Sequence, residues 1–99
     1  PTAESLMRSR FSAFALMDDA YLLRTWHPST RPAAVDFDPE LRWTHLEILD
    51  KSDGGPFHQS GKVEFRAHYK LGRRPGEMRE NSEFTRIDGN WVYVRAIGE

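Results

Sequence analysis

Residues 61–70 read Gly-Lys-Val-Glu-Phe-Arg-Ala-His-Tyr-Lys, and apolar side chains alternate with charged or polar ones along this stretch. Successive side chains of a β-strand point to opposite faces of its sheet. One face of the predicted strand is therefore apolar and consists of Val63, Phe65, Ala67 and Tyr69. This alternation is typical of an antiparallel sheet with one face buried and the other in water.

Further strands are predicted on both sides of this one, over residues 42–49, 80–87 and 91–96. Turn-forming residues separate them, because residues 52–56 read Ser-Asp-Gly-Gly-Pro and residues 71–76 contain two glycines and a proline. Between the last two strands, Asp88-Gly89 is a strong signal for a tight hairpin. The second half of the chain therefore predicts a sheet built from hairpins.

The first part of the chain predicts helices. A helix is expected over residues 3–17, with Thr2 as its N-cap and Glu4 near the positive end of the helix dipole. Its apolar side consists of Leu6, Met7, Ala13, Phe14 and Met17. A second, shorter helix follows Asp18-Asp19 and ends at Trp26, because Pro28 favours extended geometry in the residue before it. Residues 28–41 form an irregular connection.

Helices followed by hairpin-connected strands indicate an α+β fold, in which the helices pack on one face of an antiparallel sheet. The length of 99 residues fits one domain over residues 1–99.

The composition excludes several classes of protein. There are 14 Lys and Arg against 15 Asp and Glu, whereas a nucleic-acid-binding module shows a basic excess. Without cysteine, the sequence holds no disulfide framework, thiol nucleophile or cysteine-bound zinc ion. No apolar run approaches the roughly 18 residues of a membrane span, so we expect a cytoplasmic protein that contacts no membrane.

Arg10 is the residue that helix geometry singles out as a candidate for ligand binding. On a helix of 3.6 residues per turn it lies about 40° around from Leu6, while Phe14 lies at about 80°, so Arg10 falls within the apolar side. A buried, unpaired guanidinium is costly, so it needs a carboxylate, backbone carbonyls or a bound anion. Two interpretations stay open. Arg10 is either structural, as an ion pair with Glu64 or Glu80 or a chain that reaches past the helix edge, or it contacts a ligand.

A second candidate site is Trp26-His27-Pro28, at the end of the second predicted helix. At this helix end, His27 either donates a hydrogen bond to the last backbone carbonyl groups of the helix or acts as an acid–base group near neutral pH. General-base catalysis needs a partner that orients the imidazole. His27 is therefore the candidate catalytic residue, with Arg10 or Tyr93 polarising the oxygen of a substrate.

Aromatic residues on strands either form the core or line a cavity. The residues that we expect to bind a ligand in an aromatic-lined cleft are Arg10, Trp26, His27, Trp43, Trp91 and Tyr93. The four histidines, His27, His45, His58 and His68, match no compact metal signature in their spacing. We therefore predict no metal site and no cofactor.

Residues 6–14 read Leu-Met-Arg-Ser-Arg-Phe-Ser-Ala-Phe, and residues 21–29 read Tyr-Leu-Leu-Arg-Thr-Trp-His-Pro-Ser. Together with residues 61–67, 80–84 and 88–93, these segments resemble the YchJ-like family of uncharacterised bacterial proteins, in the same order and over nearly the whole chain. The resemblance implies a nuclear-transport-factor-2-like domain (a cystatin-like cone), in which helices pack against a curved antiparallel sheet.

Two features depart from the family pattern. Members carry a cysteine-rich SEC-C zinc motif just before the matched segment, so that motif either lies outside this cysteine-free sequence or is missing from this member. Members also often have a histidine before the Glu-x-Ser of a late strand, whereas here Arg79 precedes Glu80-Asn81-Ser82. The resemblance therefore implies a fold and no particular activity.

We expect a non-catalytic domain that binds a small anionic or aromatic ligand in its cleft or interacts with another protein. One alternative is a small isomerase- or dehydratase-like enzyme with His27 as general base. Another is a homodimerisation module in which two copies pack their sheet faces together. Convergence of His27 and Arg10 on one concavity would distinguish the enzyme from the binding domain.

Overall fold

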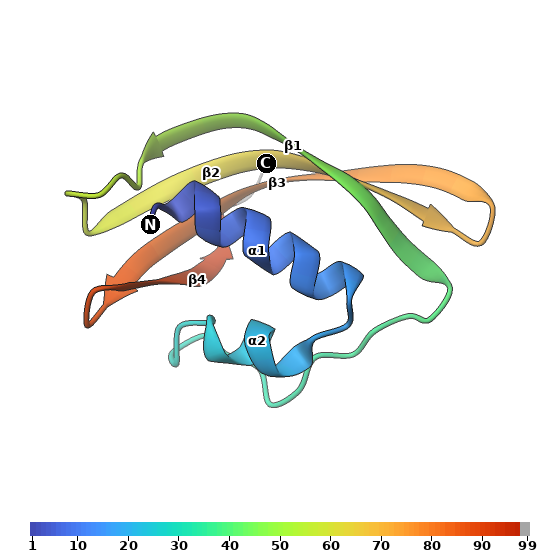
Figure 1. Cartoon of the computed structure of the whole chain (residues 1–99), viewed down its shortest axis with the longest axis horizontal. Helices are drawn as coiled ribbons and strands as arrows, with labels where there is room; N and C mark the ends of the chain where they lie inside the picture. The colour runs from blue at the N-terminus through green and yellow to red at the C-terminus, as the bar shows by residue number, and fades with distance from the viewer. Residues whose placement is uncertain (98–99) are drawn as a thin grey trace.

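In the computed structural model, which describes residues 1–97, two helices lie on one side of a four-stranded antiparallel sheet (Figure 1). The helices are α1 (Ala3–Ala15) and α2 (Asp19–Arg24), and the strands are β1 (Leu41–Asp53), β2 (Ser60–Leu71), β3 (Arg74–Ile87) and β4 (Asn90–Ala96). The strands pair in chain order, and the long strands curve over α1 (Figure 1). The predicted α+β architecture is confirmed.

The helices begin as predicted but end earlier. Thr2 and Ser5 form a capping box, in which each side chain accepts a hydrogen bond from the backbone N–H of the other. α1 ends at Ala15, because the backbone becomes left-handed at Met17 (φ 56°). Met17 is 44% exposed, so its assignment to the apolar side was wrong. No helix among residues 1–97 is long and apolar enough to cross a membrane.

The segment after α2 runs beside the sheet instead of continuing the helix. α2 ends at Arg24, and the His27 N–H donates to the Tyr93 carbonyl at 2.8 Å. The Tyr93 N–H in turn donates to the Thr25 carbonyl at 2.8 Å. These two bonds fix the residue between them, Trp26, against β4.

The local strand signals are confirmed. The side of β2 that faces the helices carries the buried residues Val63, Phe65 and Ala67. Asp88 and Gly89 form the tight connection of β3 to β4, with φ values of 52° and 84°.

The predicted turn before β2 began too early, and the predicted turn after β2 was too long. β1 continues to Asp53, and the β2–β3 hairpin needs only Gly72 and Arg73, with Gly72 at φ 63°. Pro75 is therefore a strand residue near the start of β3, where a missing N–H is tolerated.

A hydrophobic core fills the space between α1 and the sheet. Its buried members are Ala3, Met7, Val63, Phe65, Ala67, Phe84 and Trp91. Trp43 and Tyr93 pack against this core while staying partly exposed, and their rings border the cavity described next.

Candidate functional site

A cavity of about 310 Å³ lies between α1, the segment after α2 and the sheet. Its wall consists of Met7, Arg10, Phe11, Phe14, Trp26, Trp43, Phe65, Ala67, Met78, Glu80, Ser82 and Tyr93. The wall is therefore largely aromatic, with a few polar groups. Small-molecule sites are mostly apolar pockets of roughly 300–1,000 Å³ with a few placed polar groups, and this cavity falls at the lower end of that range.

Edge-to-face contacts hold the aromatic rings of the wall in place. The ring centroid of Trp43 lies 6.1 Å from that of Phe11 and 6.4 Å from that of Phe14. Across the cavity wall, the rings of Trp26 and Tyr93 meet at 5.2 Å with an interplanar angle of 86°. The rings thus come from the first helix, the segment after the second helix, and two strands.

Arg10 is the cationic residue of this wall and is only 3% exposed. Its Nη1 donates to the Leu22 carbonyl at 2.9 Å and to Thr25 Oγ1 at 2.7 Å. Its guanidinium carbon lies 5.0 Å from the ring centroid of Trp26 and 4.8 Å from that of Tyr93. Among residues 1–97, no carboxylate forms an ion pair with it. The positive charge is therefore held by a carbonyl, a hydroxyl and two aromatic faces.

Burial shifts the pKa values of the two polar groups that meet at the wall. It lowers the pKa of Arg10 to about 10, and the nearby Tyr93, Tyr21 and Glu80 oppose this decrease. It raises the pKa of the Tyr93 phenol above its ordinary value, and Glu80 adds to this increase. At neutral pH the guanidinium is thus charged and the phenol is a neutral hydrogen-bond donor.

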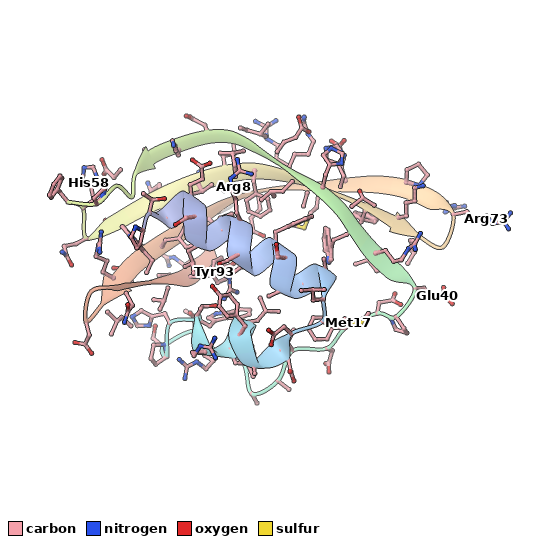
Figure 2. All side chains as sticks on the ribbon, viewed as in Figure 1. Arg8, Met17, Glu40, His58, Arg73 and Tyr93 are labelled. Carbon is pink, nitrogen blue, oxygen red and sulfur yellow. The ribbon has the colours of Figure 1, made fainter. Side chains whose placement is uncertain are left out.

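Glu80 is bound by neutral donors instead of by Arg10. Its Oε2 accepts hydrogen bonds from Ser82 Oγ at 2.6 Å and from the Tyr93 hydroxyl at 3.2 Å. Tyr93 comes from β4 and lies on the side of the sheet that carries α1 (Figure 2). Of the two carboxylates suggested as partners of Arg10, Glu80 shares its cavity and Glu64 instead pairs with Arg79.

Four of the six residues predicted to bind a ligand line this cavity: Arg10, Trp26, Trp43 and Tyr93. Trp91 does not line it. Its side chain is 5% exposed within the core, and its ring lies under Arg86, 4.6 Å from the guanidinium carbon. Trp91 borders a different hollow between the start of α1 and β4. Ligand binding itself stays a prediction for all six residues.

His27 also lies outside the residues that line the cavity. Its Nδ1 accepts a hydrogen bond from the Ser29 N–H at 3.0 Å, and Ser29 Oγ lies 2.8 Å from the same nitrogen. The ring is thereby held against the turn that follows it. Arg10 and His27 do not converge on one concavity, so the geometry that the enzyme hypothesis required is missing.

Sequence reasoning suggested Glu80 as a partner of Arg10 but missed Met78 and Ser82, the other two residues that β3 contributes to the wall. Met78, Glu80 and Ser82 stand at every second position before the buried Phe84, so the geometry of a strand places all three on the same face as Phe84. The predicted strand began only at residue 80, because the residues before it contain Pro75 and Gly76. Extending the alternation backwards would have placed Met78 on the inner face.

The outer face of the sheet is polar. Arg79 pairs with Glu64 at 2.6 Å and Arg95 with Glu83 at 2.9 Å. Arg79, at the position where the family resemblance implies a histidine, thus lies on the face opposite the cavity. A face of ion pairs is less suited than an apolar one to the packing of two sheets, and homodimerisation stays a prediction.

The hydroxyl of Thr25 connects Arg10 to α2, and replacing Thr25 with valine tests this connection. Thr25 Oγ1 accepts from Arg10 and donates to the Tyr21 carbonyl at 2.8 Å. Loss of one hydrogen bond to a charged group is expected to lower the free energy of unfolding by about 1.5 kcal/mol. Urea denaturation measures this, with the exposed Thr44→Val as control. Equal stability of the two variants would contradict the role given to Thr25.

Comparison with known proteins relates the whole fold to one family. The profile described as "YchJ, middle NTF2-like domain" matches residues 2–96. A UPF0225 protein of Streptomyces coelicolor is 60% identical over 94 residues, which cover 95% of this chain and 73% of that protein. A UPF0225 protein of Streptomyces avermitilis is 61% identical over 94 residues, covering 95% of this chain and 64% of that protein.

Two solved structures have the same fold. One is a SEC-C motif containing protein from Rhodopseudomonas palustris, with a TM-score of 0.83 and 30% identity, covering 99% of this chain and 79% of that chain. The other is a SEC-C motif containing protein from Psychrobacter arcticus, with a TM-score of 0.75 and 26% identity, covering 99% of this chain and 61% of that chain. Both relatives are longer than the segment that they share with this chain.

Proposed function

The chain belongs to the family of the middle, NTF2-like domain of YchJ, and we propose that it is a cytoplasmic, non-catalytic domain that binds a small ligand. The ligand has an apolar body, which occupies the aromatic cavity, and an anionic group, which accepts hydrogen bonds from Arg10. One observation carries the proposal: a buried guanidinium lies at the cavity wall with no carboxylate paired to it among residues 1–97.

Some hydrogen-bond donors at the cavity wall have no acceptor within the part of the protein that the structure describes. Both hydrogen bonds of Arg10 come from Nη1, and its Nε and Nη2 donate to no group within residues 1–97. The indole Nε1 of Trp26, another residue of the wall, is buried and has no hydrogen-bond partner in the same part of the chain. An unpaired buried donor such as the Trp26 indole is costly, and together with the free N–H groups of Arg10 it favours a ligand that brings acceptor oxygens, such as a carboxylate.

Glu80 sets the orientation of such a ligand. Among residues 1–97, Glu80 is the one acidic residue that lines the cavity, so its carboxylate repels the anionic end of a ligand. Ser82 and Tyr93 occupy one of its oxygens. The anionic group is therefore expected near Arg10, with the apolar body packed on Phe11 and Trp43.

The experiment measures binding of three single-ring probes of similar size: benzoate, benzyl alcohol and benzylamine. Trp26 and Trp43 line the cavity, so tryptophan fluorescence reports occupancy. We expect benzoate to bind most tightly. Arg10→Met should weaken benzoate binding about tenfold or more, since a hydrogen bond between charged groups contributes about 1.5–3 kcal/mol. Glu80→Gln should strengthen it, because a repulsive charge is removed.

Arg8→Met is the matched control, because Arg8 is an exposed arginine two positions earlier on the same helix. It should bind benzoate like the unaltered protein. A preference for benzylamine would overturn the proposed ligand class. Failure of all three probes to bind, or benzoate affinity that is the same in Arg10→Met, would overturn the site.

A further inference from the structure

The outer face of the sheet, opposite the cavity, carries a cluster of two imidazoles and a carboxylate. His45 and Glu47 lie on β1, and His68 lies on the neighbouring strand β2. Their potential ligand atoms all lie within 4.8 Å of one another. These three side chains do not line the cavity, so the cluster is independent of the proposed function.

A β-bulge places His45 in this cluster. Trp43 pairs with Tyr69 and His45 with His68, so β1 has one more residue than β2 in this interval. In a regular strand, residues 43 and 45 would point to the same face. Because the bulge at Thr44 reverses this relation, Trp43 enters the cavity wall while His45 turns outward and lies opposite His68.

The three side chains lie near one another, and the two imidazole rings must turn before they can hold one ion. His68 Nε2 lies 2.6 Å from Glu47 Oε1. The rings of His45 and His68 stack with their centroids 3.9 Å apart and an interplanar angle of 8°. Around a tetrahedral Zn²⁺ with bonds of about 2.0–2.1 Å, neighbouring donor atoms lie about 3.4 Å apart. His45 is exposed, so its side chain can rotate out of the stack and point a ring nitrogen at an ion held by His68 and Glu47.

The surrounding charges hold the carboxylate ready as a ligand. Glu47 Oε1 lies next to the Arg66 guanidinium and 2.6 Å from His68 Nε2, so an ion bound by that nitrogen would displace any proton shared between the two side chains. Arg66 is itself shared, because its Nη1 lies 3.3 Å from Glu47 and its Nε lies 3.1 Å from Glu77. Two carboxylates thus share one guanidinium. Arg66 also fixes the position of Glu47, as residues behind metal ligands commonly do.

We propose that His45, Glu47 and His68 form a binding site for a transition-metal ion of the Zn²⁺ class. Two imidazoles and one carboxylate suit Zn²⁺, Co²⁺ or Ni²⁺, whereas Mg²⁺ and Ca²⁺ prefer sets of oxygen ligands. Three protein ligands leave at least one coordination position open to solvent. The site needs no cysteine and is therefore distinct from any cysteine-rich zinc motif.

The test uses the untagged chain, titrated with Zn²⁺ by calorimetry and with Co²⁺ by visible absorption. We expect one ion bound per chain, no competition from Mg²⁺ in excess, and a Co²⁺ spectrum typical of nitrogen and oxygen ligands. His45→Ala and His68→Ala should each weaken Zn²⁺ binding at least tenfold. Circular dichroism checks that these variants keep the fold.

His58→Ala is the matched control, because His58 lies in the connection of β1 to β2, at the end of the molecule (Figure 2). It should bind Zn²⁺ like the unaltered chain. Absence of Zn²⁺ binding would overturn the proposal. Binding that persists in His45→Ala but is lost in His58→Ala would equally overturn it, since the ion would then occupy another place.

Discussion

Replacing Arg10 with alanine is expected to lower the free energy of unfolding by about 2–4 kcal/mol. The variant loses two hydrogen bonds to Leu22 and Thr25, which connect α1 to α2, and the contacts with the Trp26 and Tyr93 rings. Removing a charge that is buried without an ionic partner offsets part of this loss. The net effect stays large because the side chain is 3% exposed and its removal leaves a void.

Urea denaturation of Arg10→Ala and Arg8→Ala, side by side, measures this effect. Arg8 makes an exposed i, i+4 ion pair with Glu4, and such pairs contribute only about 0.3–0.5 kcal/mol. The two arginines lie two positions apart on the same helix, so the two variants have the same amino-acid composition and the same change in helix propensity. If both variants lost the same small amount of stability, the guanidinium of Arg10 would not hold the two helices together.

The second large effect is expected at Phe84, where alanine should lower the free energy of unfolding by about 3–5 kcal/mol. Phe84 is 0% exposed on β3, and its ring packs edge-to-face against Tyr93 at 5.8 Å. Its loss leaves a cavity in the part of the core that supports β4 and, through Tyr93, the ligand-binding wall.

Thermal and urea unfolding of Phe84→Ala and Phe57→Ala provide the comparison. Phe57 is 96% exposed in the connection between β1 and β2, so its removal should change stability by no more than about 0.5 kcal/mol. A similar decrease in the free energy of unfolding of both variants would contradict the stabilising role given to Phe84.

The fold could be predicted from local signals that need no knowledge of tertiary contacts. Alternation along β2 and the Asp88-Gly89 hairpin are properties of a few neighbouring residues. The ends of helices and strands were less predictable. Pro75 and Gly76, for example, suggest a turn, but their pairing with β2 keeps both residues in a strand. At such positions the tertiary pairing overrides the intrinsic preference of the residue.

The position of a candidate site residue could be predicted where it depends on a single helix or strand. The position of Arg10 follows from the geometry of a single helix, and the structure confirms that it is buried at the border of a hollow. The expected place of Trp91 was wrong, because β4 carries it into the core beside the first turn of α1. The cluster of His45 and His68 was invisible in sequence spacing, since it depends on strand register and on a bulge.

The central claim is that the cavity beside Arg10 is the ligand site, and methionine methyl resonances test it most directly. The chain has three methionines: Met7 and Met78 line the cavity, whereas Met17 is exposed outside it. With methyl-¹³C-methionine protein, saturating benzoate should shift the signals of Met7 and Met78 and leave that of Met17 unchanged. Unchanged signals for Met7 and Met78, or a shift of Met17 alone, would contradict the claim.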